Sequence, residues 1–210
     1  MKTNKLIYGL GVNDVDYTVQ IKQTVNGKQK LIWVCPYYSK WMGILERCSF
    51  DYHLKHPTYF GCDLHKDWKY LSNFIKWVDS QPTRDWQNCE PDKDLLSKGN
   101  KYYAPDTVVF VERRVNSFLT TSSKSRGDYM IGCSFHKATG KYMSRCMNPF
   151  SKYEGQGRHI GIFNTELEAH KAWQKRKHKY ACMLADLQED PRVAQALRER
   201  YAPDKDWTDK

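Results

Sequence analysis

The sequence predicts an α+β protein made of two small domains. Hydrophobic residues make up 40% of the chain and aromatic residues 14%, which is typical of an ordered globular protein. Alternating and helical spacings of apolar residues both occur in each half. A polar stretch, TTSSKSRGD, separates the halves and has the composition of a linker. We expect an N-terminal domain over residues 1–120, a linker over 121–128, a second domain over 129–185, and a C-terminal helix and tail over 186–210.

The N-terminal elements begin with a hairpin over residues 17–34. Asn26-Gly27 lies between its two strands, and this dipeptide favours a tight turn with positive φ angles. Helical spacing of apolar residues predicts helices over residues 37–48 and 68–78, whose tryptophans we assign to the core. A turn-rich piece over residues 80–94 and a loop over 97–106 follow. The domain closes with a strand over residues 107–111 and a short helix around Asn116.

The second domain is predicted as three antiparallel strands, over residues 129–136, 141–148 and 158–163, backed by one helix. Alternation directs two sets of side chains to opposite faces. Cys133, Phe135, Tyr142, Ser144 and Cys146 should pack on the helix, and Ser134, His136, Lys141, Met143, Arg145 and Met147 should face outward. Thr165 and Glu168 form a capping box that starts the helix. The helix should direct Ala169, Ala172, Trp173 and Tyr180 inward and Lys171, Lys175, Arg176, Lys177 and Lys179 to solvent.

The positive charge is concentrated in the same domain. Residues 121–180 hold 12 Lys and Arg against 4 Asp and Glu, whereas residues 1–120 hold 17 against 13. A basic surface with interleaved aromatic residues is typical of a protein that binds a phosphate backbone. A solvated basic helix face is the alternative interpretation.

No stretch reaches the roughly 18 apolar residues of a membrane span, and the N-terminus lacks a signal-peptide core, so we expect a cytoplasmic protein. Seven cysteines without a CxxC pair indicate reduced thiols. Three of them, with one histidine, are enough donors for a structural zinc: Cys35, Cys48, Cys62 and His65. Their separations match no compact zinc motif, which favours buried free cysteines.

Three motifs of the second domain resemble AP2 domains of the kind found in phage and mobile-element endonucleases. They are G-K-Y-M-S-R-C, I-G-I-F, and the helix entry T-E-L-E-A-H-K-A-W, within residues 126–185. The resemblance implies a sheet that binds double-stranded DNA in the major groove. The residues that inherit base or phosphate contacts are Ser134, His136, Lys141, Arg145 and His159, with Lys137 and Arg158 as backbone contacts.

The N-terminal half resembles free-standing phage endonucleases of the HNH, or ββα-metal, type. The resemblance rests on C-P-Y-Y-S-K-W-M-G-I-L-E-R-C, on P-T-Y-F-G-C-D-L-H-K-D-W, and on D-K-D-L-L-S-K-G-N-K-Y-Y-A-P-D-T-V-V-F-V with a following Asn. It implies a divalent metal, Mg²⁺ or Mn²⁺, held by Asp92 and Asn116. Asp94 is a further carboxylate, Asn100 lies in the intervening loop, and Lys93 occupies the place of the general-base histidine.

Lysine is an unusual base because it must lose its charge to accept a proton. Between Asp92 and Asp94, Lys93 is expected to stay protonated. It would then either stabilise negative charge on the phosphate, or mark a site whose catalysis has been lost.

Two functional hypotheses follow. The first is a homing-type, metal-dependent DNA endonuclease whose AP2-like domain selects the site. The second is a catalytically inactive DNA-binding protein, such as a phage regulator or a factor directed at host DNA. A module that binds an acidic protein, an RNA ligand, and either a monomeric or a dimeric state all remain open.

Overall fold

The computed structural model describes residues 6–120, 128–152 and 157–207, and confirms a mixed α+β protein. The chain forms two compact units, Met1–Val111 and Glu112–Lys210, and we describe each by itself. The division falls nine residues before the boundary expected at 120. Most of the expected linker, residues 121–127, lies outside the described residues.

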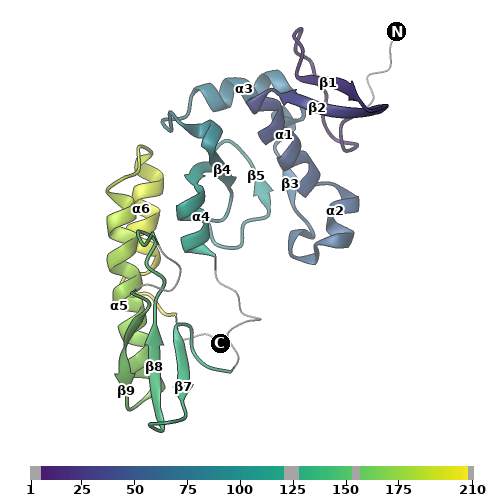
Figure 1. Ribbon diagram of the computed structural model, residues 1–210. Helices are drawn as coiled ribbons and strands as arrows, with labels where there is room; N and C mark the ends of the chain where they lie inside the picture. Colours follow the sequence, from purple (N-terminus) through teal and green to yellow (C-terminus); the bar gives the residue numbers. More distant parts are fainter. Residues whose placement is uncertain (1–5, 121–127, 153–156, 208–210) are drawn as a thin grey trace. The chain divides into compact units, whose positions relative to one another are not determined.

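The first unit contains the predicted hairpin. β1 (Gln20–Val25) pairs antiparallel with β2 (Lys28–Val34) as a two-stranded ribbon (Figure 1). Asn26 and Gly27 adopt φ angles of 52° and 72°, the left-handed conformations that this tight turn requires. The prediction of the hairpin and its turn is therefore confirmed.

The core of the first unit is formed largely by two helices, α1 (Pro36–Arg47) and α3 (Leu71–Asp79). Trp41 and Trp68 are almost fully buried, and the Trp41 indole donates a hydrogen bond of 2.6 Å to the Trp68 carbonyl. The helix predicted over 68–78 is divided, because Tyr70 is extended between a 3₁₀ turn (Lys66–Lys69) and α3. The assignment of these tryptophans to the core is confirmed.

Short elements make up the rest of the first unit; the strand predicted over residues 107–111 is among them, and the others were not predicted. α2 (Phe50–Lys55) is followed by 3₁₀ turns at Pro57–Tyr59 and Trp86–Asn88. β3 (Asp63–Leu64) pairs in parallel with β5 (Tyr102–Tyr103), and β4 (Cys89–Asp92) pairs with β6 (Val109–Glu112).

The second unit is the predicted three-stranded sheet with its helix. β7 (Cys133–His136), β8 (Lys141–Arg145) and β9 (His159–Phe163) form an antiparallel sheet in the order β7-β8-β9, packed on α5 (Glu166–Ala185). The capping box between Thr165 and Glu168 is present. α4 (Arg113–Leu119) and α6 (Pro191–Arg200) complete the unit, and α6 packs along α5.

Gly132 is essential to the contact between sheet and helix. Its φ angle is +83°, and a Cβ atom there would lie 2.1 Å from the Trp173 ring. The chain before β7 therefore passes directly over this tryptophan of α5. No residue with a side chain fits at this position without displacing the ring.

Lys177 corrects the prediction for the solvent-facing side of α5. It is 7% exposed, and its ammonium group donates 2.5 Å to the Phe118 carbonyl at the end of α4. The same group lies 3.6 Å from the centre of the Phe118 ring, a close cation–π contact. The sequence analysis placed Lys177 in solvent because the pattern of α5 alone does not reveal that α4 covers this side.

The C-terminal tail is also anchored. The Trp207 indole stacks on Tyr201 with ring centres 4.9 Å apart and donates a hydrogen bond to the Arg200 carbonyl. Gln174 of α5 donates to the carbonyls of Ala202 and Lys205. The segment up to residue 207 is thus part of the second unit.

Candidate functional site

The outer face of the β7-β8-β9 sheet brings together most of the predicted DNA contacts. Strand register puts directly opposed residues on the same face. His136 pairs with Lys141, Ser134 pairs with Met143, and Arg145 pairs with His159. The inner face carries Cys133 and Ser144, both buried against α5. The predicted assignment of side chains to the two faces is therefore confirmed for these pairs.

The outer face has basic residues at both ends and apolar residues between them. Lys141, Arg145 and His159 are exposed. The middle row adds Ile162, which is opposite Met143 and 41% exposed. The sequence analysis missed Ile162, although its alternation with the inward Phe163 was a usable signal.

The spacing of the basic ends is close to the width of a DNA groove. Lys141 and Arg145 are four residues apart on β8, which at about 3.3 Å per residue separates them by about 13 Å. The major groove of B-DNA is about 12 Å wide. An apolar row between two cationic rows suits a groove whose walls are phosphates and whose floor carries thymine methyl groups.

Three local contacts hold the outer residues. The Arg145 Nε donates to the Met143 sulfur at 2.9 Å, so the guanidinium lies along the face. His136 Nδ1 and the Thr139 hydroxyl are 2.8 Å apart, which ties the histidine to the β7-β8 turn. Lys137 is exposed in that turn, and Arg158 adjoins β9 and accepts a hydrogen bond from the Cys146 amide through its carbonyl.

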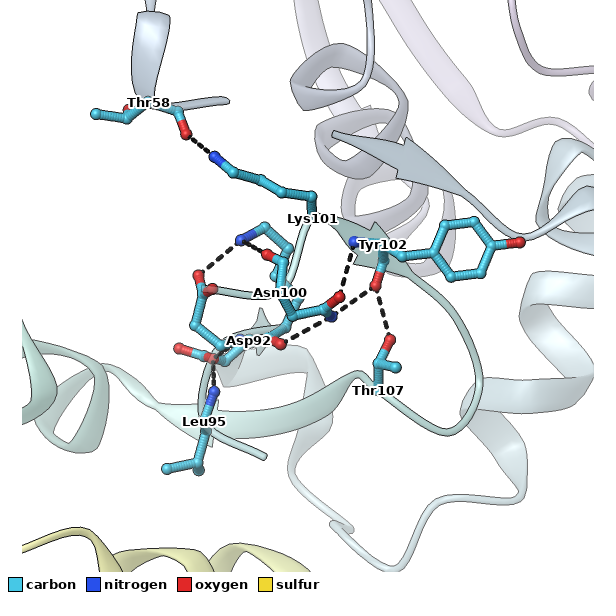
Figure 2. A network of polar contacts seen from close by, with 9 residues as sticks. Thr58, Asp92, Leu95, Asn100, Lys101, Tyr102 and Thr107 are labelled. Carbon is cyan, nitrogen blue, oxygen red and sulfur yellow. Dashed lines mark hydrogen bonds and ion pairs between the residues drawn. The ribbon is translucent and has the colours of Figure 1, made fainter. Parts of the chain in front are cut away.

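The second candidate site is the loop between β4 and β5 in the first unit. It brings together four of the five predicted catalytic residues, Asp92, Lys93, Asp94 and Asn100 (Figure 2). Asn116, the fifth, is in α4 and belongs to the second unit.

Asp92 ends β4 and starts a tight turn. Its Oδ1 accepts hydrogen bonds of 2.7 Å from the backbone amides of Asp94 and Leu95. In Figure 2 the other carboxylate oxygen points away from these amides. The carboxylate is thus fixed in orientation and only partly buried.

Lys93 points into the protein. Its side chain is 8% exposed, and its Nζ donates 2.7 Å to Asp94 Oδ2 and 2.6 Å to the Asn100 carbonyl. It pairs with Asp94 and not with both flanking aspartates, because the carboxylate of Asp92 is bonded to backbone amides. These contacts join Lys93 to Asn100 across the loop. They also engage the Lys93 amino group, which is the group that would accept a proton from water if Lys93 were a general base.

Asn100 completes the closure of the loop. Its amide group donates to the carbonyls of Lys93 and Tyr102, and its oxygen accepts from the Tyr102 amide. The Thr107 hydroxyl donates to the Tyr102 carbonyl, and Lys101 donates to the Thr58 carbonyl, as Figure 2 shows. The side chain of Asn100 is therefore fully engaged in holding the backbone.

The side chains available as metal ligands in this loop indicate which metal it suits. In the described parts of the chain, no three His, Cys, Asp or Glu side chains come together as a metal site. A closed zinc site needs four such ligands, whereas Mg²⁺ is commonly held by one or two carboxylates with its remaining positions on water and phosphate. Asp92, whose second carboxylate oxygen is not the one that the Asp94 and Leu95 amides bond, suits the second kind of site.

The three cysteines weighed as zinc donors, Cys35, Cys48 and Cys62, are buried thiols. All seven cysteines of the chain are described, and none is paired in a disulfide. Burial raises the pKa of Cys48 to about 12 and also raises the pKa of Cys62. In the absence of a metal, burial therefore favours the neutral thiol at both positions.

No family model matches the chain, and neither a curated protein sequence nor a solved structure is significantly similar to it. Among the described residues, no helix is long and apolar enough to span a membrane. The function must therefore be argued from the two sites themselves.

Proposed function

We propose that this chain binds double-stranded DNA through the outer face of the β7-β8-β9 sheet. The observation that carries the proposal is the arrangement of Lys141 and Arg145 at opposite ends of that face, with the apolar pair Met143 and Ile162 between them. Phosphates on the two groove walls meet the basic ends, and base edges meet the centre. The charge surplus of the same segment adds sequence-independent attraction.

The test is binding of a fluorescent DNA duplex pool between 50 and 200 mM salt. The double variant Lys141→Gln, Arg145→Gln should weaken binding about 10- to 100-fold, because two phosphate or base contacts are lost. The matched control is Lys171→Gln, Lys175→Gln, which removes the same charge from exposed positions of α5. The control should lose less than about threefold, since long-range attraction alone is reduced.

Equal losses in the two double variants would show general electrostatic attraction and not a binding face. Binding without salt dependence would contradict a phosphate-backbone contact. Competition with RNA duplexes and with an acidic polypeptide tests the two remaining ligand classes, and preference for either one would replace the DNA proposal.

We further propose, as a second candidate function, that the first unit is a metal-dependent endonuclease. The observation that favours it is Asp92, a carboxylate held by two amides at the end of a paired strand, with its other oxygen pointing away from these amides. A bound divalent metal would activate water and stabilise charge on the phosphate. Asp92 would hold it, and Lys93 keeps the loop closed. A DNA-binding protein without catalysis is the alternative.

Cleavage of supercoiled plasmid with Mg²⁺ or Mn²⁺, against EDTA, tests this second function. Asp92→Asn is the sharpest variant, because it removes the charge but keeps an oxygen that accepts from the Asp94 and Leu95 amides. Asp106→Asn is the matched control, since Asp106 is an exposed carboxylate of the same unit. Metal-dependent nicking that is lost only in Asp92→Asn supports the nuclease. No nicking, with salt-sensitive DNA binding intact, supports the inactive binding protein.

A further inference from the structure

The β1-β2 hairpin is a surface that neither function above uses. Its strands are exposed on both faces from Ile21 to Thr24 and from Lys28 to Trp33. It is anchored at its base, where the Cys35 amide donates to the Val19 carbonyl and Val34 packs against the core. A ribbon exposed in this way contributes little to the core of its own unit, which indicates that its faces meet something else.

The ribbon carries positive charge without any negative charge. Residues 17–34 contain three lysines and neither Asp nor Glu. Lys22 pairs with Leu31 on one face, while Lys30 pairs with Gln23 and Lys28 with Val25 on the other. The Gln29 amide donates 2.8 Å to the Thr24 hydroxyl on the Lys22 face, which agrees with this register. Cationic side chains therefore project from both sides of a thin blade.

The thickness of the β1-β2 ribbon and the positions of its lysines indicate which kind of partner it fits. Side chains on both faces make a two-stranded ribbon about 10 Å thick, from the usual spacing of stacked sheets. The major groove is about 12 Å wide, admits a two-stranded ribbon, and has a phosphate wall on each side. A blade with lysines on both faces complements two anionic walls, whereas a flat protein surface would meet only one of its faces.

The ribbon also has large exposed apolar side chains near its base. Trp33 and Ile21 lie opposite each other and are 43% and 50% exposed, and Leu31 and Ile32 are 51% and 56% exposed. A bulge between Ile21 and Lys22 interrupts the register here. Apolar side chains contact the thymine methyl groups that the major groove presents.

We propose that the β1-β2 hairpin is a second DNA contact, inserted into a groove with Lys22 on one phosphate wall and Lys28 and Lys30 on the other. This inference rests on the proposed function, since it assigns a second contact on the same duplex DNA. It places one contact in each of the two units.

The experiment compares two triple variants of the full chain. Lys22, Lys28 and Lys30 are changed to Gln together, and the control changes Lys55, Lys66 and Lys76, which are exposed lysines elsewhere in the first unit. Each neutralised phosphate contributes about 0.9 to the slope of log affinity against log salt. The hairpin variant should lower that slope by about 2 to 3 and the affinity about 10- to 100-fold, and the control should change the slope by less than 1.

Photocrosslinking gives a direct readout. A photoreactive group on Lys28→Cys, in a Cys182→Ser background, should capture duplex DNA, whereas the same group on Lys76→Cys should not. Crosslinking from Lys28→Cys supports the inference even if other changes reduce affinity by indirect means. Capture of a second copy of the chain, with dimer mass in light scattering, would overturn it in favour of pairing between hairpins.

Failure of this inference is distinct from failure of the proposed function. If the Lys141, Arg145 double variant loses binding but the hairpin triple behaves like its control, the hairpin is not a DNA contact and the sheet remains one. If the unmodified protein shows no salt-dependent DNA binding, both proposals fail.

Discussion

The β4-β5 loop and the outer face of the β7-β8-β9 sheet carry similar polar residues in opposite arrangements. In the loop, Lys93 and Asn100 are bonded to each other's backbone. The Lys93 ammonium group donates to the Asn100 carbonyl, and the Asn100 side-chain amide donates to the Lys93 carbonyl. On the sheet, Lys141 and Arg145 are exposed, and the strands that present them are held from behind by α5. The difference shows that residue type alone does not mark a site. It also matters whether the side chain is already hydrogen-bonded within the protein.

Substitutions in the loop and on the outer face of the sheet should have different effects. A substitution in the loop removes hydrogen bonds within the protein and therefore changes stability before it changes chemistry. A substitution of an exposed residue on the outer face of the sheet should leave the folded state nearly intact, so its main effect should be on the binding proposed for this face. The predictions below test this contrast, beginning with the largest effect.

Gly132→Ala should separate the sheet from the helix that supports it. The new Cβ would lie 2.1 Å from the Trp173 ring, at a φ angle of +83°, so we expect a loss of about 3 to 5 kcal/mol in the free energy of unfolding of the second unit. Urea denaturation measures this loss, and DNA binding should fall with it. The control is Gly140→Ala, at φ +63° with open space around it, which should cost about 1 kcal/mol.

Lys177 is a buried lysine of the second unit, and its effect on stability should depend on pH. Burial lowers the pKa of Lys177 to about 8 from the usual lysine value of 10.5, so the folded state holds this proton less tightly than the unfolded state. The cost of burying the charge is fully present below pH 8 and is relieved as the pH rises toward 10.5. Stability should therefore increase over this window, by up to about 3 kcal/mol in total.

The measurement is urea denaturation between pH 7 and 10, with Lys177→Met as the reference variant. Tyrosines, Cys146 and other lysines titrate in or near the same range, so the quantity of interest is the difference between the two proteins. A difference that does not vary with pH would show that Lys177 keeps its charge throughout, as a lysine in solvent does.

Lys93→Met should destabilise the first unit by about 2 kcal/mol, because Asp94 and the Asn100 carbonyl both lose the ammonium group that they share. Thermal unfolding measures this effect, and Lys98→Met, in the exposed part of the same loop, is the comparison. A general base at position 93 would give a different result, namely loss of any metal-dependent cleavage with stability unchanged.

The smallest expected effect is at the start of α5. Thr165→Ala removes the side chain that accepts from the Glu168 amide and should cost about 1 kcal/mol in the stability of the second unit. The DNA affinity of the fully folded variant should not change, because the outer face of the sheet is untouched. Chemical denaturation and duplex binding, measured on the same sample, check both statements; a change in affinity alone would place Thr165 in the binding surface.

The fold of the second unit was largely predictable, because its signals are local. Alternation in β8, the capping box at Thr165 and the Asp190-Pro191 start of α6 each act within a few residues. β4 was missed because Pro91 lies in its middle; this residue has no amide to donate, and its neighbours read as turns. The strand is recognisable only by pairing with β6, which is a non-local contact.

The candidate sites divide in the same way. The facing of Lys141 and Arg145 follows from alternation, whereas the inward direction of Lys93 depends on the Asn100 carbonyl seven residues away. Burial of Lys177 depends on Phe118, 59 residues away in the sequence. Contacts across such distances leave no periodic signal in the chain.

The burial of six cysteines has a practical consequence for chemical labelling. Alkylating reagents attack thiolates that they can reach, and burial raises the pKa of Cys133 to about 12 and of Cys146 to about 11. Cys182, on α5, is the seventh and is partly exposed. A maleimide dye should therefore attach to the native protein at this one position, which would give a single-site fluorescent derivative without any engineered cysteine.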